Sequence, residues 1–480
     1  MRSEKILQRS AFVPEWVWLL PVMVPLLLIL ISYVFQTWSW GLMDDLQLLS
    51  LPGGWWQRTQ TAFNIYLSVG EFKPLFAAHS AFFYHVFARA PGAFHVFKLL
   101  EILLMLALWG RAAKLVTGER VAFWLVPAIA LSFHYLYDQF FFLSTHETLG
   151  LLFAGIAVNA AIHIVQGDKG RLSIGAWSIL LIAMLCSFWS KETMVAVGGA
   201  CGASFVVTAL MGRERRPGLL YAGVILIAGV LAYGLWLKLA VCTSYTSRYN
   251  VMNLVLLRDN LLEWAKKDLL NHFPWLVAGV WLFRKGVKSF GEDAFGYLTR
   301  WALVFGVFVY GAHLLILLPW NTGTYYAAPF GVYFGFVFAV LIARAIAGLT
   351  LRPVLLIVSA AVMLNVFVAA FALERERTYH MNTQDLWEAI RGNDRFCSAA
   401  REGKVATNAP EPGSAIPGHV NRWWGLGFKA FVWDKDFSAG KSDGFEYYVY
   451  SPRFWTMAPG AFNGWQIEFN SRFWKVYRKP

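Results

Sequence analysis

Long apolar segments alternate with short polar ones over most of the chain. Runs of about 18 or more apolar residues, the length that crosses a bilayer's hydrocarbon core as a helix, recur from residue 13 to residue 372. These runs are continuously apolar and lack the period-two alternation of lipid-facing barrel strands. The pattern predicts an all-α polytopic membrane protein with about eleven transmembrane helices.

The basic residues between the spans set the expected orientation. The spans are expected at 13–35, 93–115, 122 to about 137, 148–166, 174–188, 193–211, 219–240, from 274, up to 319, 325–342 and 354–372. Lysine and arginine gather in every second connection, beginning with the N-terminal segment, which has no small-residue cleavage site. A cytoplasmic N-terminus and a periplasmic C-terminus are therefore predicted.

Two further segments break the pattern of spans. In the first outer loop, residues 72–88 are apolar, rich in phenylalanine and too short to span, which predicts interfacial helices. From residue 374 the chain becomes polar and Gly-rich, with short alternating strands at 446–451 and 465–470. We expect a transmembrane catalytic domain at 1–373 and a small α+β periplasmic domain at 374–480.

Composition supports a membrane protein and argues against a nucleic-acid-binding protein. Hydrophobic residues make up 58% of the 480 residues and charged residues 15%, with a mean hydropathy of +0.48. The net charge of +13 is scattered over short loops, without the basic stripe or stacking platform that a nucleic-acid interface needs. Cys242 and Cys397 both fall in segments predicted to be periplasmic, where a disulfide is permitted but not required.

Ionisable residues gather at the predicted outer ends of the spans. They are Asp44, Asp45, Glu71, Lys73, Asp138, His146, Glu147, Lys191, Glu192 and Arg248. Charges near the bilayer tend to face a cavity and to have a function. Each also has a simpler interpretation, as a helix cap, a solvated ion pair or an interface anchor. Their shared placement favours an active site on the outer face.

The order of the motifs resembles a known enzyme class. Acids follow the first span, and Glu71-Phe72-Lys73-Pro74 precedes an aromatic-rich helix. An acid opens the fourth span in S-T-H-E-T-L-G, a lysine ends the fifth in W-S-K-E-T, and T-Y-Y-A-A-P-F comes late. Together these motifs resemble the C-type (GT-C) integral membrane glycosyltransferases, in the branch of bacterial lipid A aminoarabinose transferase and the protein O-mannosyltransferases. The resemblance covers residues 14 to 345.

The resemblance implies a role for each matching position. The family's catalytic acid falls on Asp44 or Asp45, and its acid at the fourth span falls on Glu147. Its cluster of Phe, Glu, Lys and Pro resembles Glu71, Lys73 and Pro74 with Glu and Phe exchanged. Of its Lys-Gly-Pro motif, only Lys191 matches. The substrate-binding positions implied in this way also include His146, Tyr325 and Tyr326.

These residue types suit glycosyl transfer from a lipid phosphate. A carboxylate of Asp44 or Asp45 would act as general base on the acceptor hydroxyl. Lys73, Lys191 and Arg248 would stabilise the departing phosphate. Glu71, His146 and Glu147 are acceptable ligands for a divalent metal ion, which their spacing neither establishes nor excludes.

The leading hypothesis is an inverting glycosyltransferase of the bacterial inner membrane. It would take a sugar from a polyprenyl-phosphate donor and modify a cell-envelope acceptor, either a glycan, a lipid such as lipopolysaccharide, or a protein. The alternative is a transporter or flippase of lipid-linked saccharide, which should place ionisable residues at mid-bilayer and pair broken helices across two halves. A third interpretation is a structural subunit of an envelope assembly. The sequence identifies neither the sugar nor the acceptor.

Overall fold

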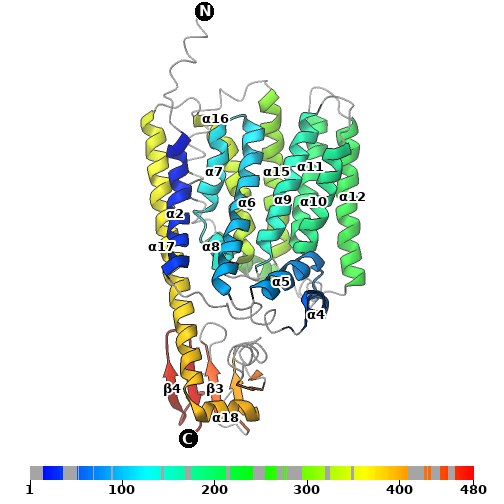
Figure 1. The fold of residues 1–480 in the computed structure, drawn as a ribbon. Helices are drawn as coiled ribbons and strands as arrows, with labels where there is room; N and C mark the ends of the chain where they lie inside the picture. The colour runs from blue at the N-terminus through cyan, green and yellow to red at the C-terminus, as the bar shows by residue number, and fades with distance from the viewer. Residues whose placement is uncertain are drawn as a thin grey trace, which may run out of the picture.

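In the computed structural model, the apolar helices lie side by side and form one bundle (Figure 1). The structure describes residues 15–35, 51, 53–68, 70–87, 90–141, 145–167, 174–211, 217–241, 254–266, 273, 275, 277, 294–318, 325–346, 351–408, 426–429, 431–433, 444–451 and 460–480. Within these residues eight helices are long and apolar enough to cross a membrane, or nine if a bent pair counts as one span. The prediction of a polytopic all-α membrane protein is confirmed.

The bundle is formed by helices from all parts of the chain. They are α2 (Glu15–Phe35), α6 (Pro91–Thr117), α7 (Arg120–Ala130), α8 (His134–Phe141), α9 (Glu147–Gln166), α10 (Ile174–Ser190), α11 (Val195–Met211), α12 (Pro217–Ala240), α15 (Ala294–Leu317), α16 (Ala328–Ile346) and α17 (Leu351–Arg391). Their buried apolar side chains form one core cluster that extends from α2 to α17. The expected span that begins at residue 274 lies almost entirely outside the described residues, so a total of eleven stays a prediction.

The third expected span is not one continuous helix. The chain turns by 81° between α7 and α8, where Ser132 N–H donates to the carbonyl of Ile129 at 3.0 Å and leaves the α-helical pattern. Pro127 lies inside α7, and a proline weakens the helix around it. The span predicted from residue 122 to Tyr137-Asp138-Gln139 is therefore bent. These residues lie in the short, buried helix α8.

Asn365 of α17 holds this broken region together. Its Nδ2 donates to the carbonyl of Pro21 at 2.7 Å and to that of Ala128 at 2.8 Å. Pro25 has no N–H to offer the carbonyl of Pro21, and the turn after α7 removes the usual donor to Ala128. One buried amide therefore supplies the donors that two irregular helices lack, and it joins α17 to α2 and α7.

Replacing Asn365 by leucine should destabilise the bundle. Both carbonyls lose their donor, and each buried unsatisfied group costs about 1–3 kcal/mol. We expect the melting temperature of the purified protein in detergent to fall, while Met363→Leu, on the exposed side of the same helix, leaves it unchanged. Equal melting temperatures for Asn365→Leu and the parent protein would refute this bridging role.

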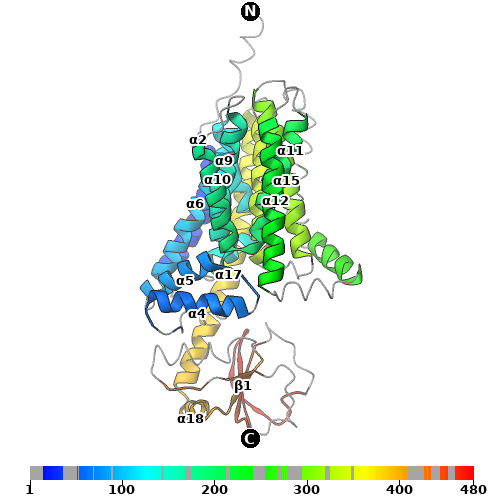
Figure 2. The same cartoon turned by 90° about the vertical axis from the view of Figure 1, so that its right-hand side faces the viewer.

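Two helices lie across one end of the bundle (Figure 2). These are α4 (Trp55–Ser68) and α5 (Pro74–Val86), which correspond to the interfacial helices predicted for the first outer loop. Pro74 occupies the first position of α5, where the missing N–H costs nothing. Residues 254–266 are also helical.

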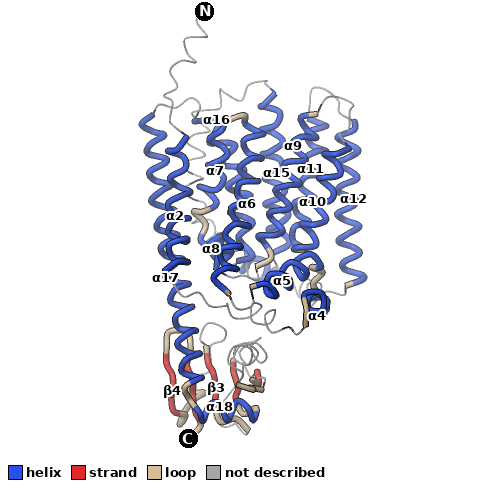
Figure 3. The backbone as a smooth tube through the Cα atoms, viewed as in Figure 1, coloured by secondary structure: helices blue, strands red, loops and turns tan. Residues whose placement is uncertain are grey.

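The C-terminal part lies on the same side of the bundle as α4 and α5, and Figure 3 shows that it contains the described strands. α17 crosses residue 373 without a break and leads to α18 (Asp394–Glu402). The strands are β1 (Val405–Thr407), β2 (Val432–Trp433), β3 (Tyr447–Tyr450), β4 (Gln466–Asn470) and β5 (Lys475–Arg478), in the order β2-β1-β3-β5-β4.

The sheet mixes parallel and antiparallel pairs. β1 pairs in parallel with β2 and β3, whereas β5 is antiparallel to β3 and β4. The strands expected at 446–451 and 465–470 correspond to β3 and β4. Cys397 is a buried free thiol in α18, and Cys242 lies outside the described residues. The division into two domains stays a prediction.

Candidate functional site

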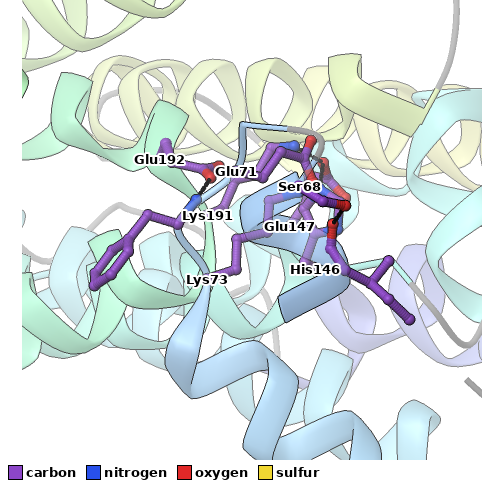
Figure 4. Close-up of polar contacts among 9 residues, drawn as sticks. Ser68, Glu71, Lys73, His146, Glu147, Lys191 and Glu192 are labelled. Carbon is purple, nitrogen blue, oxygen red and sulfur yellow. Dashed lines mark hydrogen bonds and ion pairs between the residues drawn. The ribbon is translucent and has the colours of Figure 1, made fainter. Parts of the chain in front are cut away.

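Charged side chains from three segments meet where α4 and α5 cross the bundle end (Figure 4). The first segment joins α4 to α5 and carries Glu71 and Lys73. The second precedes and begins α9, with His146 and Glu147. The third follows α10, where Lys191 is followed by Glu192 in the short 3-10 helix η1 (Glu192–Met194). Segments some 120 residues apart in sequence thus form one cluster.

The turn between α4 and α5 positions Glu71 and Lys73. Glu71 N–H donates to the carbonyl of Tyr66 at 2.8 Å, so the chain folds back after α4. Lys73 immediately precedes α5, and its side chain is fully buried. The ammonium pairs with Glu71 and lies 5.3 Å from the centre of the Tyr66 ring.

Lys191 is placed by the end of α10. Its N–H donates to the carbonyl of Ser187 at 3.0 Å, and the hydroxyl of Ser187 donates to the carbonyl of Gly150 on α9 at 2.8 Å. A Cβ at Gly150 would lie 2.9 Å from Cγ of Met194 and 3.4 Å from Cβ of Lys191. Because Gly150 has no side chain, α9 can come close enough to bring the start of that helix to Lys191.

The Lys191 ammonium is surrounded by groups from the other segments. It contacts Nε2 of His146 and lies 3.5 Å from Oε1 of Glu147. It also lies 4.6 Å from the centre of the Tyr326 ring, which belongs to the 3-10 helix η3 (Tyr325–Ala327). Lys191, His146 and Glu147 are all buried, so water cannot screen these interactions strongly.

Glu192 closes the cluster from the opposite side. Its Oε1 accepts a hydrogen bond of 2.6 Å from the N–H of Phe72, between Glu71 and Lys73. Its Oε2 is buried without a hydrogen-bond partner among the described residues. Oε1 of Glu147 lies 3.1 Å from Nε2 of His146 and 3.5 Å from the Lys191 ammonium. Because buried carboxylate oxygens need donors, Oε2 of Glu192 can accept a further hydrogen bond.

Electrostatic coupling fixes the charge states on the outer side of the cluster. Burial would raise the pKa of Glu71, but Lys73 and Lys191 hold it below its ordinary value. Burial would lower the pKa of Lys73, but Glu71 and Glu192 raise it. Burial also lowers the pKa of Lys191, and Lys73 adds to this effect. Glu71 and Lys73 therefore form an ionised pair. The Lys191 ammonium beside them loses its proton more readily than an ordinary lysine does.

His146 is uncharged at neutral pH. Burial lowers its pKa to about 4, and Lys191 and Lys73 act in the same direction although Glu147 opposes them. Its Nε2 lies 3.5 Å from the Lys73 ammonium and contacts that of Lys191. A neutral ring that accepts at Nε2 carries its proton on Nδ1. Nε2 of His146 also lies 3.1 Å from Oε1 of Glu147, so the ring lies between both ammonium groups and this carboxylate.

The buried neutral imidazole should make stability depend on pH. The pKa of His146 is about 4 in the folded protein and about 6.5 when unfolded, so the unfolded chain binds the extra proton first and stability falls from pH 6.5 toward pH 4. We expect a loss of about 2 kcal/mol at pH 5 relative to pH 7.5. Thermal unfolding at both pH values measures it.

Two glutamine variants separate this effect from other titrations. His146→Gln should lose most of the pH dependence between 5 and 7.5, because the titrating ring is gone. His163→Gln, at an exposed position of α9, should keep it. A parent-like pH dependence in His146→Gln would show that another group is responsible.

The structure brings together most of the predicted site residues. Glu71, Lys73, His146, Glu147, Lys191 and Tyr326 share the cluster. Asp44, Asp45 and Arg248 lie outside the described residues, and the side chain of Tyr325 is also outside them. Asp138 is elsewhere, paired with Arg375 of α17.

The hypothesis of a divalent metal gains no support from this geometry. Among the described residues no group of three or more His, Cys, Asp or Glu side chains is placed to hold a metal ion. The Lys191 ammonium occupies the space beside His146 and Glu147 where a cation would bind. We therefore assign no catalytic step to a metal ion.

Sequence reasoning missed other buried polar groups close to the site. His79 of α5 contacts Glu101 of α6, and Lys98 lies 3.6 Å from the same carboxylate. Lys98 also donates to the carbonyl of Thr145, next to His146, at 2.7 Å. The available signal was a lysine and a glutamate three residues apart inside an apolar span, which places them on one helix face.

Comparison with known proteins yields one relevant fold. No protein-family model and no curated protein matches the chain. Among solved structures it is similar to ArnT from Cupriavidus metallidurans bound to undecaprenyl phosphate, with 12% sequence identity, a TM-score of 0.45, and coverage of 96% of this chain and 97% of that chain. We base the proposed function on the side chains of this chain.

Proposed function

We propose that the protein is an inverting glycosyltransferase that moves a sugar from a polyprenyl-phosphate donor to a cell-envelope acceptor. The observation that carries this proposal is the cluster of two buried ammonium groups, those of Lys73 and Lys191, beside the buried carboxylate of Glu147. Lys73 and Lys191 suit an anionic leaving group. Glu147 suits a sugar or acceptor hydroxyl. The cluster lies at the end of the bundle, where lipid headgroups are.

The reaction needs one base and one site for the leaving phosphate. Asp44 or Asp45 removes the proton of the acceptor hydroxyl as its oxygen attacks the anomeric carbon from the face opposite the phosphate. The bond between that carbon and the phosphate oxygen breaks, and its electron pair leaves with the lipid phosphate. Lys73, Lys191 and Arg248 stabilise this anion.

The remaining polar groups hold these residues in place. Glu71 keeps Lys73 ionised and oriented, and Glu192 ties the Glu71–Lys73 turn to Lys191 through the N–H of Phe72. Tyr326 covers the Lys191 ammonium with its ring, and Tyr325 completes the polar start of η3. Fixing cations before the reaction lowers the cost of stabilising charge as it develops.

The proposed location is the bacterial inner membrane, with the site on the periplasmic face and the N-terminus in the cytoplasm. The protein is multi-pass, since its described helices include eight candidate spans. The first outer loop and the C-terminal part lie on one side of the bundle (Figure 2). Residues 1–373 would form the catalytic domain and residues 374–480 a smaller periplasmic one.

Transfer from a labelled donor tests the proposal directly. Purified protein in liposomes receives a polyprenyl-phosphate sugar with a radiolabelled sugar and a cell-envelope extract. We expect label to leave the lipid fraction and to appear on an acceptor with the opposite anomeric configuration. Movement of intact donor between leaflets without release of the sugar would instead favour the flippase alternative. No transfer across the available donors and acceptors would argue against an enzyme.

A further inference from the structure

A groove runs along α6 at the end of the bundle opposite the charged site. Its volume is about 400 Å³, and its lining includes Leu104, Ala107 and Leu108 of α6, Phe123 of α7, and the cations Arg111 and Lys114. The first turns of α6 are on the site's side, where Lys98 reaches Thr145. The last turns, which carry both cations, are therefore at the other membrane face (Figure 1).

The lining residues form one stripe with an apolar part and a cationic part. Spacings of three and four residues place side chains on the same helix face. From Leu104 to Leu115, which also lines the groove, the stripe is about 16 Å long at 1.5 Å per residue. Its apolar part, from Leu104 to the first cation at Arg111, is about 10 Å long, which is roughly two thirds of the hydrocarbon thickness of one leaflet, about 15 Å. The cations lie in the last two turns of the helix, at headgroup level.

This face of α6 is open to lipid. Leu104 is 54% exposed in the bundle, and Arg111 and Lys114 are exposed as well. At Gly110 the helix comes so near to α7 that a Cβ would lie 2.5 Å from the carbonyl oxygen of Phe123. That backbone contact fixes the position of the α7 wall beside the groove.

We propose that this groove binds one anionic phospholipid of the leaflet opposite the charged site. Its phosphate would lie between Arg111 and Lys114, and one acyl chain would follow Leu104, Ala107 and Leu108 toward the bilayer centre. The two cations provide charge complementarity, since basic residues at the membrane surface attract anionic lipids. The apolar part of the groove covers the portion of an acyl chain nearest the headgroup, and a polyprenyl chain extends much further beyond it. The inference does not depend on the proposed function.

Lipid retention measured by native mass spectrometry tests the inference. The full chain is released from bilayers of equal phosphatidylglycerol and phosphatidylethanolamine, and the retained lipids are counted. We expect the parent protein to retain one phosphatidylglycerol in preference to phosphatidylethanolamine. Arg111→Gln and Lys114→Gln should each reduce this preference about fivefold, the effect of about one basic contact.

Matched variants separate a built site from general charge attraction. Ala107→Phe fills the apolar part, keeps both cations, and should also abolish the preference. Arg300→Gln removes an exposed cation at the beginning of α15, outside the groove lining, and should have no effect. Equal retention of both lipids by the parent, an unaltered preference in the Arg111/Lys114 double variant, or displacement of phosphatidylglycerol by equimolar polyprenyl phosphate would overturn the inference.

Discussion

Replacing Asp44 or Asp45 by asparagine should reduce sugar transfer by about 10²- to 10⁴-fold, because removing a general base costs a factor of this size. Only the variant that lacks the base should show this loss, and the other should stay close to the parent. The asparagine side chain has nearly the same shape but cannot accept the proton of the acceptor hydroxyl. Initial rates with saturating labelled donor give the comparison.

The asparagine experiment needs a control for the loss of any outer carboxylate. Asp259→Asn serves, because Asp259 is exposed on the 254–266 helix and pairs with Arg258 at 2.8 Å. It should transfer sugar at the parent rate. Melting temperatures of all three variants should match the parent if Asp44 and Asp45 act in the reaction. Parent-like transfer by both Asp44→Asn and Asp45→Asn would eliminate the general-base assignment.

The bundle could be predicted from the sequence because its signal is simple. A helix that crosses a membrane must be apolar over its whole length, and the runs that begin at residues 13, 93 and 219 correspond to α2, α6 and α12. The break between α7 and α8 was missed because hydropathy does not register a turn inside an apolar run. The carbonyl of Ala128, released there, accepts from Asn365, more than 200 residues away.

Hydropathy also did not show where the last helix ends. Apolar residues stop near Leu373, which predicts the membrane boundary, yet α17 continues to Arg391. Polar residues do not end a helix unless a glycine or proline intervenes, and Gly392 is the first glycine after this point. Arg375, just beyond the apolar part, pairs with Asp138 of α8. That pair accounts for one of the charges that the sequence had placed with the site.

The sequence placed several of these side chains in one cluster, but it did not predict their contacts. Motif order identified Lys73, His146, Glu147 and Lys191 as neighbours, and the structure places them in contact. The partner of each side chain was not predictable, because a contact depends on how helices pack and not on spacing along the chain. The sequence grouped Glu192 with the other outer charges, but it did not predict that its carboxylate accepts from Phe72 N–H across 120 residues.

Charge balance links the fold to the proposed chemistry. Two buried lysines would be costly alone, and three glutamates around them reduce that cost. The donor phosphodiester that enters carries one negative charge, and the polyprenyl phosphate that leaves gains a second. The ammonium groups attract this phosphate and the carboxylates repel it, so both kinds of group define its position. The neutral imidazole of His146 separates the two cations and lets them lie near one phosphate. This arrangement suits an anion that must bind and then leave.

Lys191→Met should abolish most of the transfer activity and also destabilise the protein. The phosphate loses a buried cation, and losing one such electrostatic group costs about 10²- to 10³-fold in rate. Glu147 loses the ammonium 3.5 Å away, and breaking a buried ion pair from one side costs about 3–5 kcal/mol. Both effects follow from one contact, so activity and melting temperature are measured on the same preparation.

A second substitution distinguishes chemistry from misfolding. In Lys191→Met/Glu147→Gln the uncompensated carboxylate is gone, so the melting temperature should return toward the parent value. Transfer should remain far below that of Glu147→Gln alone, and binding of polyprenyl phosphate should weaken in step with the loss of Lys191. Lys266→Met, which removes an exposed lysine on the 254–266 helix, should leave rate, binding and stability unchanged. If the stabilised double variant transferred sugar as fast as Glu147→Gln, Lys191 would not contact the leaving phosphate.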